Sequence, residues 1–229
     1  RKCKGEYSSL ISSFRYIELS YYMTMIANAS STEEIWRIYE DAKRENARVL
    51  LVQTRVNVIA LNCLSKLEKN TYLQNVAQVI RNSNGDYNEK VIFDIENIYL
   101  EVVRRNAILG INRLAFLDSN DRLKYLEIIN SAPNVSIINN SLSEATFESY
   151  KRGAIYSING LDSLSHREKS DYLLSIENVV NIAQLRDIVG RAKAHNEANN
   201  ENKLTSKIEK MFSSMFDSKV ASQSKGRKI

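Results

Sequence analysis

Apolar positions recur along the chain with a long period. A tyrosine followed by an apolar residue heads a short apolar stretch four times, at steps of 50, 53 and 47 residues. These tyrosines are Tyr22, Tyr72, Tyr125 and Tyr172. Self-similarity at a period of roughly 20–50 residues is typical of chains built from repeated supersecondary units. The pattern therefore predicts four copies of one unit.

Four further apolar positions keep a fixed offset from each tyrosine. They lie one and four residues after it, and eight and eleven residues before it. In chain order they are Ile11, Phe14, Met23 and Ile26; Leu61, Leu64, Leu73 and Val76; Leu114, Leu117, Leu126 and Ile129; and Leu161, Leu164, Leu173 and Ile176. We expect these positions to line a small core in each copy. In the second copy Leu61, Leu64, Val76 and Ile95 should be buried.

Each copy is predicted to hold three helices. The first should end at the apolar pair before the tyrosine, and the second should begin near the tyrosine after a polar turn. At that turn Ser65 and Ser165 are each followed three residues later by glutamate, which is capping-box spacing. Asp118 takes the same place in the third copy. At the next hinge, Ser31 and Ser141 precede a glutamate at the same spacing, so they are expected to start the third helix.

The third helix shows apolar residues at a spacing of 3.6. In the second copy this pattern arrives ten residues late, after the polar insertion RNSNGDYNEK, in which Asn84-Gly85 predicts a turn. The residues are Ile35, Ile38, Tyr39 and Ala42 in the first copy; Ile95, Ile98, Tyr99 and Val102 in the second; and Leu185, Ile188, Val189 and Ala192 in the fourth.

Helix breakers are rare between copies. The chain has one proline and seven glycines, and neither occurs from Thr32 to Lys66. We therefore expect an all-α fold of tandem three-helix bundles, joined by fused helices into an elongated rod. The expected units span residues 5–48, 49–103 with an insertion near 81–90, 104–150 and 151–200. A C-terminal helix and a basic tail, residues 201–229, should follow, with the end frayed.

Composition argues against several functions. The net charge is +5, but acidic and basic residues interleave, which indicates solvated helix faces better than a nucleic-acid-binding stripe. Lys225, Arg227 and Lys228 are interpreted as a solubility feature or a junction rather than as a contact for nucleic acid or an anionic surface. No apolar run approaches about 18 residues, so no membrane span is expected.

The cysteines and histidines, which often act in catalysis or metal binding, are scattered along the sequence. Cys3 and Cys63 fit neither a disulfide framework nor a metal site and are expected to be free, partly buried thiols. His166 and His195 are expected to be solvated. The sequence contains no nucleophile–base pair, glycine-rich phosphate loop or metal-binding motif. We therefore expect no enzyme, no cofactor and no metal.

The doubled tyrosine of the first copy points to a contact surface. Tyr21 is turned about 100° from Tyr22 on a helix, so Tyr21 should be exposed if Tyr22 packs inward. Met25 lies four residues further on, and together the two side chains would form an apolar patch of the kind that anchors interfaces. Packing of Tyr21 on a neighbouring helix is the alternative. Trp36 flanks the core residue Ile35 and could serve packing between copies or a ligand.

Two copies resemble a known family, the GA module, which is the protein G-related albumin-binding three-helix bundle of Gram-positive surface proteins. In the first copy the resemblance rests on Ser20-Tyr21-Tyr22, Ile26, Asn28-Ala29, Glu33 and Ile35. The fourth copy, INGLDSLSHREKSDYLLSIENVVNIAQLRDIVGRAKAHN, is similar to the module in giant staphylococcal extracellular-matrix-binding proteins. The resemblance covers most of residues 8–200 and is weakest in the second copy.

The resemblance implies a secreted or wall-attached bacterial protein without catalysis. It implies a host-protein ligand, most often serum albumin and otherwise an extracellular matrix protein, docked on the second helix, the hinge and the third helix. Carried onto the first copy, the candidate contacts are Tyr21, Met25, Asn28, Ser31, Trp36 and Arg37.

Two other functions stay open. The same helices would serve as a passive stalk that presents another domain. They would also serve as an intracellular scaffold that binds protein or nucleic acid, which the free cysteines and the basic tail favour. The aromatic face of the first copy favours ligand binding over the stalk.

Overall fold

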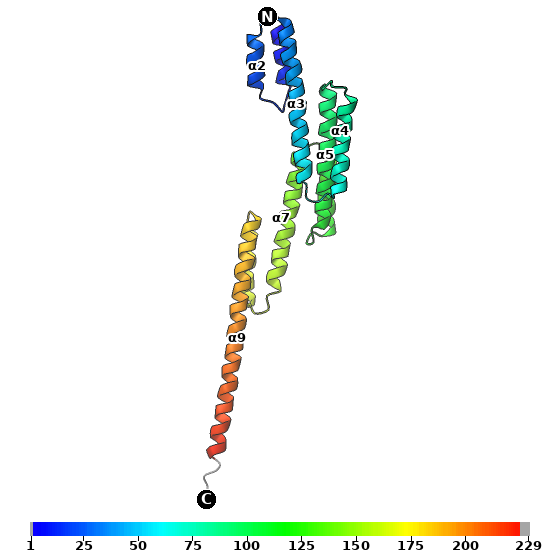
Figure 1. Cartoon of the computed structure of the whole chain (residues 1–229). Helices are drawn as coiled ribbons and strands as arrows, with labels where there is room; N and C mark the ends of the chain where they lie inside the picture. The colour runs from blue at the N-terminus through cyan, green and yellow to red at the C-terminus, as the bar shows by residue number, and fades with distance from the viewer. Residues whose placement is uncertain (1, 225–229) are drawn as a thin grey trace. The chain divides into compact units, whose positions relative to one another are not determined.

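The computed structural model describes residues 2–224, with the side chains of residues 3–211, and its ribbon is shown in Figure 1. Within that range every regular element is a helix, so the all-α fold class is confirmed. The helices are α1 Lys2–Ser12, α2 Leu19–Asn28, α3 Thr32–Ala60, α4 Lys66–Asn82, α5 Glu89–Arg113, α6 Ser119–Ser131, α7 Val135–Asn159, α8 His166–Glu177 and α9 Ile182–Ser224. The basic residues Lys225, Arg227 and Lys228 lie outside the described residues.

Long helices are shared between consecutive copies, which we call repeats 1 to 4. α3 has 29 residues and packs against α1 and α2 as well as α4 and α5, as Figure 1 shows. The predicted fusion is therefore present, and α3 ends at Ala60, directly before the apolar pair Leu61 and Leu64 at which the sequence predicted its end. Residues 61–65 form a turn without glycine or proline, because Ser65 caps the next helix and the turn is held by α5.

The chain divides into two compact bodies. One comprises Arg1–Arg113 with Arg122–Leu142, and the other comprises Leu114–Asp121 with Ser143–Ile229. The division falls inside repeat 3 and within α7, so it does not coincide with the repeat boundaries expected from the sequence. The elongated rod stays a prediction.

Separate apolar clusters form the cores of repeats 1, 2 and 4. The position four residues after each tyrosine is buried in all four repeats, at Ile26, Val76, Ile129 and Ile176. The tyrosines themselves are half-buried, and Tyr22 and Tyr172 pack against the cores of repeats 1 and 4. Leu64 and Ile95 are buried as expected, whereas Leu61 is only half-buried because it lies in the turn just beyond α3.

The caps at the start of the second helix are confirmed. Ser65 and Ser165 each form a complete capping box with the glutamate three residues later. Asp118 Oδ1 accepts the backbone N–H of Asp121 at 2.8 Å. In repeats 2 to 4 these helices begin six residues before the tyrosine, which is earlier than the apolar pattern alone suggests.

The hinge before the third helix differs between repeats. Ser31 Oγ accepts the N–H of Glu34 at 3.1 Å, which caps α3 as expected. The expectation for Ser141 was wrong, because α7 begins at Val135 and Ser141 lies buried inside it. Asn134, directly after Pro133, is the cap, since its Oδ1 accepts the N–H of Ile137 at 3.0 Å.

A polar side chain clamps the turn after the first helix in every repeat. It lies on the long helix and accepts a backbone N–H from that turn; we call these contacts the turn clamps. They are Tyr16 N–H to Asn46 Oδ1 (2.9 Å), Cys63 N–H to Asn106 Oδ1 (2.9 Å), Phe116 N–H to Ser149 Oγ (3.3 Å) and Ser163 N–H to Asn196 Oδ1 (2.8 Å). Each clamp satisfies a donor that the turn cannot satisfy within its own backbone.

A basic side chain three residues before the tyrosine caps the preceding helix in repeats 2 to 4. Lys69 donates to Ile59 O at 2.7 Å and Lys169 to Asn159 O at 2.9 Å. Arg122 donates to Ile111 O and Asn112 O, both at 2.9 Å. These cations satisfy carbonyls at a helix C-terminus and face the negative end of its dipole.

Candidate functional site

An open groove between α2 and α3 in repeat 1 is the strongest candidate site. Its volume is about 620 Å³. The residues that line it are Glu18, Ser20, Tyr21, Thr24, Met25, Asn28, Glu34, Arg37, Ile38 and Asp41. Four of the six residues proposed from the sequence, Tyr21, Met25, Asn28 and Arg37, therefore lie together on its walls.

The apolar part of the groove is exposed to solvent. Tyr21 is 58% exposed and Met25 is 37% exposed, so neither is used by the bundle core. The ring of Tyr21 meets that of Tyr22 edge-on, with centroids 5.1 Å apart and an interplanar angle of 84°. Because Tyr22 packs against the core, this contact holds the exposed ring in place. A fixed aromatic ring offers contact area at little cost in conformational entropy.

The polar part of the groove is organised by the hinge. The Glu34 carboxylate accepts the Ser30 N–H at 2.7 Å and the Ser30 hydroxyl at 2.8 Å. The hydrogen bonds from Ser30 hold the pKa of Glu34 below its usual value, so Glu34 is charged at neutral pH. Arg37 reaches back to Glu33 at 2.6 Å. The groove therefore combines an apolar wall with a rim of fixed charges.

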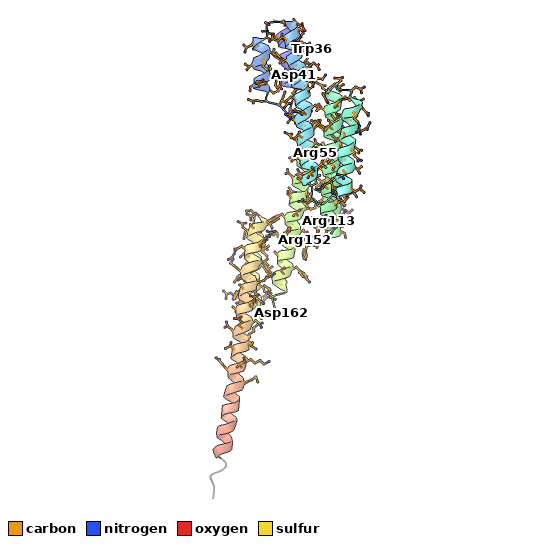
Figure 2. All side chains as sticks on the ribbon, in the orientation of Figure 1. Trp36, Asp41, Arg55, Arg113, Arg152 and Asp162 are labelled. Atoms are coloured by element: carbon orange, nitrogen blue, oxygen red, sulfur yellow. The ribbon has the colours of Figure 1, made fainter. Side chains whose placement is uncertain are left out.

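The two remaining sequence candidates lie outside the groove lining. Ser31 is exposed, and its hydroxyl is engaged in capping α3. Trp36 is 51% exposed on α3, near the start of the helix, where Figure 2 labels it. It is one residue away from Arg37 and so turned about 100° from the groove wall. The structure thus places Trp36 outside the groove that Tyr21, the other exposed aromatic candidate, lines.

Sequence reasoning missed several residues of the lining. Thr24 and Asp41 each lie three or four residues from a residue already proposed, so helical spacing would have placed them on the same face. Glu34 had been noticed only as half of a capping box. Its carboxylate instead binds Ser30, which orients it at the end of the groove.

Repeat 4 has the same groove between α8 and α9. Its volume is about 480 Å³, and it is lined by Ser175, Asn178, Val179, Ala183, Gln184, Asp187, Ile188 and Arg191. Six of these positions lie 150 residues after lining positions of the first groove, as in Asn28 and Asn178. The hinge bonds also recur, since Gln184 Oε1 accepts the Val180 N–H at 2.9 Å.

The chemistry of the two grooves differs. Tyr21 and Met25 of the first repeat correspond to Asp171 and Ser175 of the fourth. The charges on the third helix are exchanged: the first groove has Arg37 and Asp41, and the fourth has Asp187 and Arg191 at the same positions. Apolar residues near the fourth groove lie instead at Leu174 and Val180, which are 56% and 77% exposed. The fold keeps the shape of the groove while its side chains vary.

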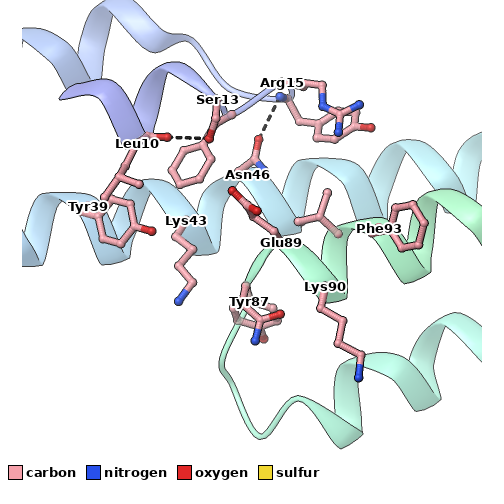
Figure 3. Close-up of a pocket in the computed structure, with 14 residues that line it drawn as sticks. Leu10, Ser13, Arg15, Tyr39, Lys43, Asn46, Tyr87, Glu89, Lys90 and Phe93 are labelled. Carbon is pink, nitrogen blue, oxygen red and sulfur yellow. Dashed lines mark hydrogen bonds between the residues drawn. The ribbon is translucent and has the colours of Figure 1, made fainter. Parts of the chain in front are cut away.

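A larger cavity of about 830 Å³ lies where repeats 1 and 2 join, and Figure 3 shows it in close-up. Two of its polar side chains are engaged in contacts within the protein. Asn46 holds the turn clamp, and Lys43 binds Asp86 of the insertion at 2.7 Å. That insertion turns at Asn84 and Gly85, which have φ values of 50° and 85°. We interpret this cavity as part of a structural joint rather than as a ligand site.

Other chemistry finds little support. Cys3 and Cys63 are free and half-buried, as expected. His195 Nε2 lies 3.0 Å from Glu168 Oε1 and its Nδ1 lies 3.3 Å from the Tyr172 hydroxyl, so it is less solvated than expected and bridges two helices. In the described part of the chain, no cluster of His, Cys, Asp and Glu could hold a metal. No helix there is long and apolar enough to cross a membrane.

Repeats 1 and 4 each have an open groove between the second and third helices. Residues 150–198, from the second half of α7 into α9, match the family model of the GA module. The match supports a GA module in repeat 4, and the GA module family is one of binding rather than catalytic domains. No curated protein matches the chain.

Proposed function

We propose that this chain is a segment of a bacterial surface protein that binds a host serum or matrix protein, with serum albumin favoured. The GA module in repeat 4 supports an albumin-binding family at a coarse level. We further propose that the protein is secreted or attached to the cell wall. Binding needs no cofactor.

We place the ligand on the α2–α3 groove of repeat 1. The observation that carries this choice is the pair Tyr21 and Met25, which stay exposed side by side while the core of the bundle is complete without them. Large exposed side chains of this type supply most of the binding energy at protein interfaces. Asn28 and Arg37 would add oriented polar contacts at the rim of the groove.

The experiment compares two equivalent positions. Serum albumin, and separately fibronectin, is titrated against the wild type, Tyr21→Ala and Asp171→Ala, the corresponding position in repeat 4. Loss of a central aromatic anchor costs about 2 kcal/mol or more, which is roughly thirtyfold in affinity. We expect that loss for Tyr21→Ala and no change for Asp171→Ala. The reverse result would move the site to repeat 4.

A third variant, Trp36→Ala, measures how far the contact surface extends around α3. Because Trp36 lies outside the groove, we expect a smaller loss than for Tyr21→Ala. The passive stalk is the second candidate function, and the helices shared between repeats favour it. Absence of saturable binding of either host protein by the wild type would favour the stalk or the intracellular scaffold.

A further inference from the structure

Repeat 2 exposes an apolar stripe on α3. Val52, Val56 and Ile59 are 52%, 60% and 54% exposed, although they belong to a helix whose other face is well buried. The buried face of the same segment is formed by Leu50, Thr54 and Val58. The core of repeat 2 therefore does not account for the exposed stripe.

The stripe has the spacing of a helix-packing seam. Val49, which is half-buried, extends it by one position, so the steps between its members are three, four and three residues. We call these four residues, Val49, Val52, Val56 and Ile59, the α3 seam. Alternating steps of three and four residues are the a and d positions of a heptad, at which one helix packs along another.

An unpaired cation lies beside the α3 seam. Three exposed arginines of α3 each pair with a carboxylate three or four residues earlier: Arg37 with Glu33, Arg44 with Asp41 and Arg48 with Glu45. Arg55, labelled in Figure 2, has Leu51 and Val52 at those positions instead. Among the described residues no carboxylate pairs with Arg55.

Arg55 also connects the α3 seam to a second hollow. It lines a groove of about 410 Å³ between α3 and α4, together with Leu51, Leu73, Val76 and Ala77 among others. The apolar surface therefore continues from the α3 seam, past one guanidinium group, onto α4. A partner that covered this surface would desolvate Arg55, which is unfavourable unless the partner supplies a negative charge.

We propose that the α3 seam and the adjoining α3–α4 groove form a second docking surface, for an amphipathic helix of another protein. That helix would carry apolar residues at heptad spacing and a carboxylate facing Arg55. This proposal goes beyond the function proposed above, because the surface lies on repeat 2 and shares no residue with the α2–α3 groove.

The charge of Arg55 argues against a second copy of this chain as the occupant. Arg55 lies beside the α3 seam, near the middle of its length. A two-fold antiparallel pairing of two α3 seams would therefore place the two Arg55 side chains against each other. Like charges brought together at an interface oppose association. A partner with a carboxylate at that point has no such repulsion.

Comparison with repeat 4 shows that the bundle does not require the α3 seam. Relative to the repeat tyrosine, Val52, Val56 and Ile59 correspond to Arg152, Tyr156 and Asn159 of α7. Arg152 is bound there to Asp118 at 2.9 Å and to Glu148 at 2.8 Å within its own body. The equivalent helix face in repeat 4 is thus polar at two of three positions, while its core is intact.

The test uses two synthetic helical peptides of three heptads with leucine at every a and d position. They are identical except that the flanking positions carry glutamate in one and lysine in the other. We expect the full chain to bind the glutamate peptide saturably. Val56→Ser should weaken this binding by about tenfold or more, and Arg55→Glu should reverse the preference in favour of the lysine peptide. Circular dichroism checks that each variant keeps its helices.

Two controls isolate the surface. Leu174→Ser removes an equally exposed leucine from α8 and should leave peptide binding unchanged. Tyr21→Ala should also leave it unchanged, which separates this surface from the α2–α3 groove. Equal binding of both peptides, no binding of either, or glutamate-peptide binding that survives both Val56→Ser and Arg55→Glu would overturn the proposal. A dimer in sedimentation equilibrium that Val56→Ser abolishes would assign the surface to a second copy and overturn it as well.

Discussion

Replacing Asn106 by alanine should release the turn between α3 and α4. Asn106 is 8% exposed, and its Oδ1 accepts the Cys63 N–H at 2.9 Å. The substitution leaves that partly buried donor without its partner, and such a loss costs about 1–3 kcal/mol. The shorter side chain also leaves a void against the turn, which adds to the cost. We expect repeat 2 to lose stability in this range while its helices stay formed.

The assay is native-state hydrogen exchange, because a chain of several repeats need not unfold in one step. The Cys63 amide should exchange roughly 5- to 150-fold faster in Asn106→Ala, because the exchange rate depends exponentially on the lost free energy. Amides of repeat 4 should keep their protection. Asn62→Ala, at an exposed position of the same turn, is the control and should change little. An unchanged Cys63 amide in Asn106→Ala would refute the idea that the clamp holds the turn.

Four further predictions test other parts of the fold. Leu64→Ala, at 6% exposure, should cost about 2–5 kcal/mol, with faster hydrogen exchange confined to repeat 2 and its neighbours; uniform loosening of all repeats would contradict this. Thr54 Oγ1 is buried without a partner, so Thr54→Val should raise the urea midpoint, by about 1 kcal/mol in stability; a lower midpoint would show that the hydroxyl is satisfied. Hydrogen bonds from Ser165 lower the pKa of Glu168 to about 2 from an ordinary value of 4.5. The stabilisation of α8 by Glu168 is therefore complete above pH 4.5 and is lost as the pH falls towards 2. Hydrogen exchange at the start of α8 should show this loss, and Glu168→Gln should remove the pH dependence. Small-angle scattering should give a radius of gyration well above the roughly 17 Å of a compact chain of this length, and a compact value would exclude the rod.

The apolar positions at fixed offsets from the repeat tyrosines predicted much of the fold, because a position that is buried in every repeat stays apolar in every repeat. Ile26 and Ile176 occupy equivalent places in their cores, and the two positions could be aligned from the sequence alone. The capping boxes were equally predictable, since both partners lie within four residues of each other. Local spacing also predicted that Tyr21 and Met25 would be exposed on one face.

Contacts between distant residues were not predictable in this way. Asn46 and Asn196 look like ordinary surface residues in the sequence, and only the fold brings each one to a turn about 30 residues earlier. Ser141 failed for another reason, because serine and glutamate at capping-box spacing also occur inside helices. Asn134 after Pro133 was the stronger signal for the start of a helix. The position of Trp36 outside the groove depends on which face of α3 meets α2, which a one-dimensional pattern fixes only approximately.

The continuous helix α3 sets the angle between the surfaces of repeats 1 and 2, because both surfaces include residues of this helix. Each residue added to a helix turns everything beyond it by about 100° and advances it by about 1.5 Å. One residue inserted near Ala47 would therefore swing the α3 seam to a different side from the groove that contains Tyr21. Seven inserted residues turn it by about 700°, within roughly 20° of two full turns, and would nearly restore its direction. The number of residues in the shared helix thus decides whether one partner can reach both surfaces at once.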